Sequence, residues 1–134
     1  MSALKTLTLL LALGGYQLAH AEQPLKSNEL SPLELARGIE IFQFHCARCH
    51  GKTAEGDGRF AVIYRRLHSN LPSNFTMGYF ASRPADYLKT IIENGGEANK
   101  RSKYMPPFQD ALSSVEIDLL ARLIQKTGAD RRFP

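Results

Sequence analysis

Two cysteines and a histidine stand together in the segment Cys46-Ala47-Arg48-Cys49-His50. A C-x-x-C-H motif of this kind is the attachment signature of c-type haem. Two thiols about one helical turn apart can each add to a vinyl group on the same edge of a porphyrin, and the next residue then has its imidazole under the iron. The motif therefore predicts one covalent haem c, attached through Cys46 and Cys49, with His50 as an axial ligand of the iron.

Three other uses of the motif compete with haem attachment. A thioredoxin-like redox pair would need a preceding strand and a βαβ context, and the sequence shows neither. A zinc site would need two further ligands at suitable spacing, and the chain has only two cysteines. A structural disulfide fits an exported protein, but it leaves the adjoining histidine and the long predicted loops unexplained.

A six-coordinate haem needs a second axial ligand, and the candidates are Met77, Met105, His45 and His68. Met105 is favoured because it lies in a predicted loop, where Pro106 and Pro107 restrict the backbone that holds its thioether. Met77 has no such brace and is expected to fill a gap in the core. His45 precedes the motif on the same segment and cannot reach across the porphyrin, whereas His68 stays an alternative. Ligation by histidine and methionine raises the reduction potential and leaves no open coordination site, which favours electron transfer over oxygen chemistry.

The first 21 residues have the pattern of a secretory signal peptide. Lys5 gives a positive start, an apolar run covers 7–13, and residues 19–21 (Ala-His-Ala) match a signal-peptidase site. We expect residues 1–21 to be removed and residues 22–134 to form a single domain in the periplasm. The apolar run is too short to span a bilayer comfortably, so no stable membrane insertion is expected, and a retained N-terminal anchor is the alternative.

The composition is that of a soluble globular protein, with 43% hydrophobic and 22% charged residues. Removal of the leader takes away one positive charge, Lys5, and lowers the formal net charge from +4 to +3. The basic residues form no long stripe and accompany no nucleic-acid motif, so nucleic acid is not expected as a partner. Two cysteines cannot form a disulfide framework, and the thin core of so small a domain is therefore expected to depend on the haem.

Capping signals and hydrophobic periodicity predict an all-α domain with long loops. A first helix is expected to open at Ser31, with Pro32 at its first position and Glu34 completing a capping box, and to run into the cysteine motif. Further helices are expected over 59–67, from Ser82 or Arg83 to Gly95-Gly96, and from Ser113 to Gly128. Loops as long as those expected over 68–79 and 97–112 are unusual in a small domain unless they have something to wrap.

From about Leu33 to Gln125 the chain resembles the class I mono-haem c-type cytochromes. The resemblance rests on the C-x-x-C-H motif, a G-x-x-x-F pattern at residues 38–42, the glycine-rich turn of 51–58, Met105-Pro106 and the final helix. It implies a small class I cytochrome c fold of three to five helices wrapped around one covalent haem. It also implies that Gly38 lets the last helix cross closely, and that the carbonyl of Pro72 accepts the ring N–H of His50.

Three positions depart from the family pattern. Ala54 replaces a glycine, Arg59 replaces a proline that often follows the Asp-Gly pair, and Leu123 replaces an aromatic residue of the last helix. These departures affect loop shape and helix packing, and none of them touches the ligands of the iron.

The expected function is that of a periplasmic electron carrier, which holds one electron at a time on a His/Met-ligated haem and is not itself an enzyme. Its partners would be a redox-protein donor and acceptor. Acidic surfaces are expected on them, because Lys100, Arg101 and Lys103 precede Met105 and should edge the haem crevice. Two alternatives stay open: a haem-bearing subunit of a larger dehydrogenase or oxidase complex, or a haem enzyme or gas-binding protein in which Met105 is labile.

Overall fold

The computed structural model describes residues 29–134, so the predicted signal peptide of residues 1–21 lies outside the described residues. In this part of the chain the structure is helical and contains no strand. The elements are α1 (Pro32–His45), α2 (Ala47–His50), α3 (Ala61–Arg66), the 3-10 helix η1 (Gly78–Ser82), α4 (Ala85–Ala98) and α5 (Ser114–Asp130). The predicted all-α fold with up to five α-helices is confirmed.

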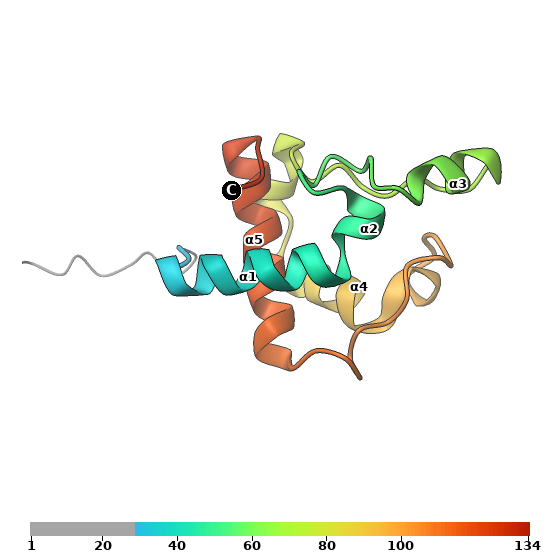
Figure 1. Cartoon of the computed structure of the whole chain (residues 1–134). Coiled ribbons are helices and arrows are strands. Elements are labelled where there is room, and N and C mark those ends of the chain that lie inside the picture. The colour runs from blue at the N-terminus through green and yellow to red at the C-terminus, as the bar shows by residue number, and fades with distance from the viewer. Residues whose placement is uncertain (1–28) are drawn as a thin grey trace, which may run out of the picture.

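Helices α1 and α5 cross and form the centre of the fold, with α4 and η1 packed against α5 (Figure 1). Their contact faces supply the most deeply buried large side chains, which are Phe42, Ile117, Leu120, Leu123 and Thr127. Both helices begin with the predicted capping box. The Ser31 hydroxyl accepts a hydrogen bond from the N–H of Glu34 at 3.3 Å, and Ser113 and Glu116 repeat this arrangement in α5.

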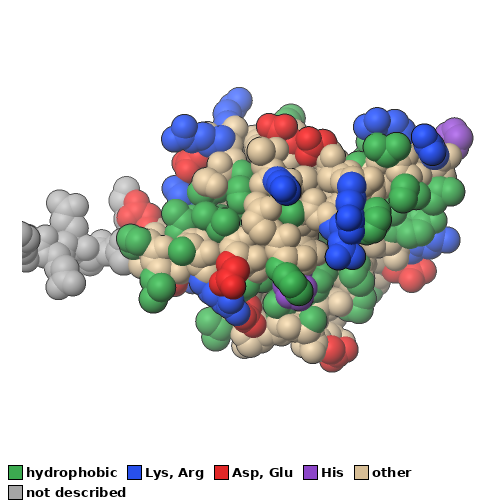
Figure 2. Space-filling view, viewed as in Figure 1, with side chains coloured by type: hydrophobic (Ala, Val, Ile, Leu, Met, Phe, Trp, Pro, Cys, Tyr) green, Lys and Arg blue, Asp and Glu red, His purple; other side chains and the backbone are tan. Residues whose placement is uncertain are grey.

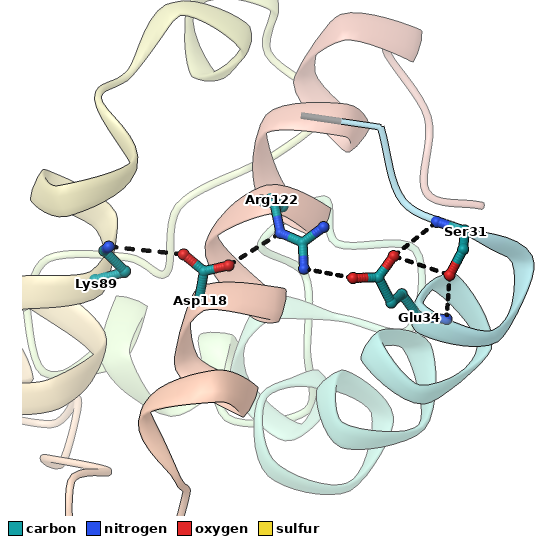
Figure 3. A network of polar contacts seen from close by, with 5 residues as sticks. All are labelled: Ser31, Glu34, Lys89, Asp118 and Arg122. Carbon is teal, nitrogen blue, oxygen red and sulfur yellow. Dashed lines mark hydrogen bonds and ion pairs between the residues drawn. The ribbon is translucent and has the colours of Figure 1, made fainter. Parts of the chain in front are cut away.

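A chain of polar contacts joins the start of α1 to α5 and α4 (Figure 3). Glu34 pairs with Arg122 at 2.8 Å and also accepts the N–H of Ser31 at 2.8 Å. These hydrogen bonds lower the pKa of Glu34 to about 2, and the bond from Arg122 has the largest effect. Arg122 also pairs with Asp118 at 3.0 Å, and Asp118 lies 3.6 Å from Lys89. Because the pairs are partly exposed, each adds little to stability.

Helix α5 does not end at Gly128, as its glycine suggests, but continues to Asp130, and Arg131 then turns left-handed with φ 54°. The reason is a tertiary contact. A Cβ on Gly128 would lie 2.7 Å from the backbone nitrogen of Ala81 and 2.8 Å from Cβ of Phe80. Gly128 is therefore the point where α5 meets η1 backbone to backbone. In α4, by contrast, Gly95 breaks the regular helix as predicted, with φ 76°.

The crossing of α1 and α5 at Gly38 is looser than the family resemblance implies. A Cβ on Gly38 would lie 3.4 Å from Cγ of Leu119 and 3.5 Å from Cδ2 of Leu123, which is ordinary van der Waals contact. The close contact of the last helix that requires glycine is at Gly128, against η1, and not at the crossing with α1.

We expect Gly128→Ala to destabilise the protein by about 1–3 kcal/mol, because the added methyl group overpacks the contact between α5 and η1. Gly38→Ala is the matched control, since alanine is favoured in a helix by up to about 1 kcal/mol over glycine and has room there. Guanidinium unfolding followed by circular dichroism measures both changes. Equal unfolding midpoints for the two variants would contradict the packing assigned to Gly128.

Candidate functional site

A cavity of about 940 Å³ lies between the cysteine motif, the loop before η1, helix α4 and the loop that precedes α5. Its wall brings together side chains that are far apart in the sequence, among them Cys46, Cys49, His50 and Met105. The apolar part of the lining includes Phe75, Phe80, Leu88, Ile92 and Phe108. The volume is in the range of cofactor pockets, so the two long loops do enclose a site.

Cys46 and Cys49 are free thiols in the structure, which does not support a disulfide. Burial, and secondarily the neighbouring Cys49, raises the pKa of the Cys46 thiol to about 12. A redox-active or zinc-binding cysteine reacts as the thiolate, which this environment disfavours. Over residues 29–134 no group of three or more His, Cys, Asp or Glu side chains could hold a metal ion. The zinc and thioredoxin-like interpretations therefore find no support in the described residues.

The imidazole of His50 is held in one orientation at the cavity wall. Its Nδ1 lies 3.0 Å from the carbonyl oxygen of Ser73, and its ring stacks on Phe75 with centroids 4.5 Å apart. When Nδ1 donates to that carbonyl, Nε2 is the nitrogen that can bind a metal. Burial lowers the pKa of His50 against the opposing effect of the Ser73 hydrogen bond, so the ring is neutral at pH 7. Neutral imidazole is the form that ligates iron.

The prediction that the Pro72 carbonyl accepts this hydrogen bond is wrong by one residue. The Pro72 carbonyl oxygen faces the glycine-rich turn instead, where a Cβ on Gly56 would lie 2.5 Å from it. Gly56 has φ 79°, and the neighbouring Ala54 accepts a hydrogen bond from the N–H of Phe75 at 2.8 Å. These contacts fix which carbonyl points at His50, and no local signal in the sequence identifies Ser73.

Of the four candidate distal ligands, Met105 and His45 line the cavity, and Met77 and His68 do not. Met77 is 50% exposed, so the expectation that it fills a gap in the core is wrong. The Met105 backbone is held on both sides: its carbonyl accepts the N–H of Gly96 at 2.9 Å, and its N–H donates to the carbonyl of Ser102 at 3.2 Å.

Among residues 29–134 the charged side chains of the cavity wall are cationic, and no Asp or Glu of this part of the chain lines it. Arg48, Arg83, Lys100 and Arg101 belong to this wall. Cζ of Arg83 lies 5.4 Å from the ring centre of Tyr79 and 5.2 Å from that of Tyr87, and Arg101 donates a hydrogen bond to the Tyr87 hydroxyl. Lys100 and Arg101 were expected at this edge, whereas Lys103, expected with them, does not line the cavity. Sequence reasoning missed Arg48 and Arg83, although Arg83 and Tyr87 are four residues apart around the start of α4. A haem carries two carboxylates, so the charge of the wall suits it.

The family model for cytochrome c oxidase, cbb3-type, subunit III, matches residues 33–124, which include the cysteine motif and Met105. The chain belongs to this family. The cbb3-type cytochrome c oxidase subunit FixP of Sinorhizobium medicae is 23% identical over 106 residues, or 77% of this chain and 33% of that protein. The chain thus spans about a third of the length of this relative. Membership in a c-type cytochrome family is confirmed, and haem c is the cofactor that the family implies.

The side chains present fit a haem c. Cys46 and Cys49 offer two thiols, His50 offers Nε2 and Met105 a thioether, all on the wall of one cavity. Within residues 29–134, none of the helices has the length and apolar character that a membrane crossing requires.

We predict that Met105→Ala abolishes the weak far-red absorption band of iron–thioether ligation in the oxidised protein, because Met105 is the predicted distal ligand and lines the cavity. Met77→Ala is the control and should keep the band, since Met77 is half exposed and does not line the cavity. Absorption spectra of the two purified variants decide the question. Loss of the band in the Met77 variant alone would show that the wrong sulfur has been chosen.

Proposed function

We propose that this protein is a periplasmic electron-transfer cytochrome with a single haem c, attached to Cys46 and Cys49 and ligated by His50 and Met105. The observation that carries the proposal is that two free thiols, an oriented imidazole and the thioether of Met105, whose backbone is hydrogen-bonded on both sides, line one cavity. When bound, the haem supplies an iron that alternates between the ferrous and ferric states. If His50 and Met105 both held the iron, the haem would have no open site for a substrate, so no reaction at the iron is proposed.

The chain's own residues tune that iron. The Ser73 carbonyl holds the Nδ1 proton of His50, which fixes the ring and raises the basicity of the ligand. The apolar side chains of the cavity wall, among them Phe75 and Phe80, lower the polarity around the proposed haem position. The Gly96 and Ser102 hydrogen bonds hold the Met105 loop in place and so oppose the loss of the distal ligand.

A second candidate is a cytochrome subunit bound within a larger oxidase complex. It is favoured by the matching family model and by the name of the FixP relative, of which this chain covers one third. Size-exclusion chromatography of a native extract separates the two, because a free carrier elutes at the size of this chain alone.

Intact mass tests the covalent haem. We expect the purified periplasmic protein to have the mass of the chain from Glu22 plus one haem. The variant with the double substitution Cys46→Ser/Cys49→Ser should have the mass of the polypeptide without haem. Two free thiols or a disulfide in the wild-type protein, made with the haem-attachment machinery present, would end the proposal. A mass that includes residues 1–21 would contradict only the signal peptide.

Charge reversal tests the partner surface. Lys100 and Lys103 are exposed beside the cavity, and neither takes part in an ion pair among the described residues. Arg101 is left intact in the test because it bonds Tyr87. We expect Lys100→Glu/Lys103→Glu to slow electron transfer with the native partner by about tenfold at low ionic strength, since long-range attraction sets the association rate.

The control is Lys52→Glu/Arg132→Glu, which makes the same change in net charge at exposed residues that do not line the cavity. Stopped-flow kinetics should show the difference between the pairs vanish above roughly 0.3 M salt, where charges are screened over a few ångströms. Equal rates for the two variants at low salt would show that Lys100 and Lys103 do not attract the partner.

A further inference from the structure

Helix α3 and the turn after it expose a group of aliphatic side chains. The exposed fractions are 49% for Val62, 47% for Ile63, 55% for Leu67 and 48% for Leu71. Figure 1 shows α3 projecting from the body of the molecule, and it is absent from the helix pairs that build the core. In Figure 2 hydrophobic side chains gather over this end of the molecule. Single exposed aliphatic residues are ordinary, but a cluster of four within ten positions indicates a contact surface.

The same segment is positively charged. Arg59, Arg65 and Arg66 are exposed, and the sequence has no acidic residue from 58 to 85. None of the three arginines takes part in the ion pairs of residues 29–134, all of which join side chains of α1, α4 and α5. We call the seven side chains the α3 face: Arg59, Val62, Ile63, Arg65, Arg66, Leu67 and Leu71.

The α3 face adjoins the candidate haem site. Tyr64 lies with its hydroxyl 3.5 Å from Sγ of Cys49, and its ring stacks on Tyr104 with centroids 5.0 Å apart. Leu71 is itself part of the cavity wall. The stacked tyrosines therefore connect the α3 face to the loop that carries Lys103 and Met105, beside one of the two proposed attachment points.

We propose that the α3 face docks an acidic electron-transfer protein, which exchanges one electron with the haem past the Cys49 edge of the cavity. The inference rests on the proposed function. It adds that the partner makes an apolar contact and that it binds at the α3 face. Arginine suits this role because its planar guanidinium binds carboxylates in pairs of hydrogen bonds, and it is enriched with apolar residues at interfaces.

Two features favour a protein over a lipid surface. A single myristoyl chain gives only reversible membrane binding, and four half-exposed aliphatic side chains offer less apolar surface than that. Contacts between electron-transfer proteins, in contrast, are small and short-lived, so a surface of this size suffices. A position beside the candidate haem site suits a partner that carries electrons, because electron transfer needs a short distance between the two redox centres.

The test measures oxidation of the ferrous, haem-loaded full chain by an acidic blue-copper protein in stopped flow, where one electron passes from ferrous iron to cupric copper. Ile63→Ser/Leu67→Ser should lower the second-order rate constant between about five- and tenfold at low and at high salt, because apolar contact is not screened. Arg65→Gln/Arg66→Gln should slow it only at low salt. Leu33→Ser/Val115→Ser is the matched control at residues that are 82% and 73% exposed elsewhere, and it should react like wild type.

Oxidation by the small complex tris(phenanthroline)cobalt(III), which needs no protein docking, should be unchanged in every variant. If neither blue-copper protein nor cobalt complex oxidises the wild type, the proposed function fails. If cobalt reacts but the copper protein does not, or if the α3 variants match the Leu33/Val115 control, only the docking proposal is overturned. It is overturned as well if the α3 substitutions abolish a dimer in sedimentation, or abolish binding to vesicles of phosphatidylcholine with phosphatidylglycerol.

Discussion

The orientation of His50 depends on one hydrogen bond, and that bond depends on how two loops meet. The ring can present Nε2 to a metal only while Nδ1 is engaged by the Ser73 carbonyl, 3.0 Å away. That carbonyl is held in place because Gly56, at φ 79°, lets the glycine-rich turn lie directly against the segment before Phe75. A hydrogen bond of 2.7 Å from the Gly56 N–H to the His50 carbonyl closes the turn on the motif itself.

The opposite wall of the cavity is built in the same way. Gly95, with φ 76°, breaks α4 so that its chain meets the Met105 loop, and a Cβ there would lie 2.8 Å from the Met105 carbonyl. Gly96 then donates its N–H to that carbonyl. Both proposed ligands are thus positioned by contacts between backbones at glycines.

The sequence predicted the parts of the structure that local interactions determine. The capping boxes at Ser31 and Ser113 involve residues three positions apart, and the C-x-x-C-H motif spans only five consecutive residues. Both can therefore be identified without knowledge of the tertiary structure. The errors fall where a distant segment decides the outcome. Gly128 stays helical because η1 packs against it, and Ser73 rather than Pro72 meets His50 because the glycine-rich turn sets the register of that loop.

The cluster of Arg83, Tyr87 and Arg101 belongs to the same category. Its two arginines are 18 positions apart and meet only once the cavity has formed, although the spacing of Arg83 and Tyr87 gave a partial signal. Motifs and helix caps in the sequence are therefore enough to locate such a site. The atoms that orient its ligands cannot be identified in this way, because they depend on how the loops pack.

The ion pairs of the described residues are confined to α1, α4 and α5, as Figure 3 illustrates for Glu34, Arg122, Asp118 and Lys89. Cations on that side are neutralised by neighbours, whereas Arg48, Arg83 and Lys100 on the cavity wall have no carboxylate beside them in this set. The cavity wall therefore carries positive charge that no ion pair of the described residues compensates. A negatively charged neighbour feels the attraction of this wall before contact and is turned toward it, which shortens the rotational search that limits association.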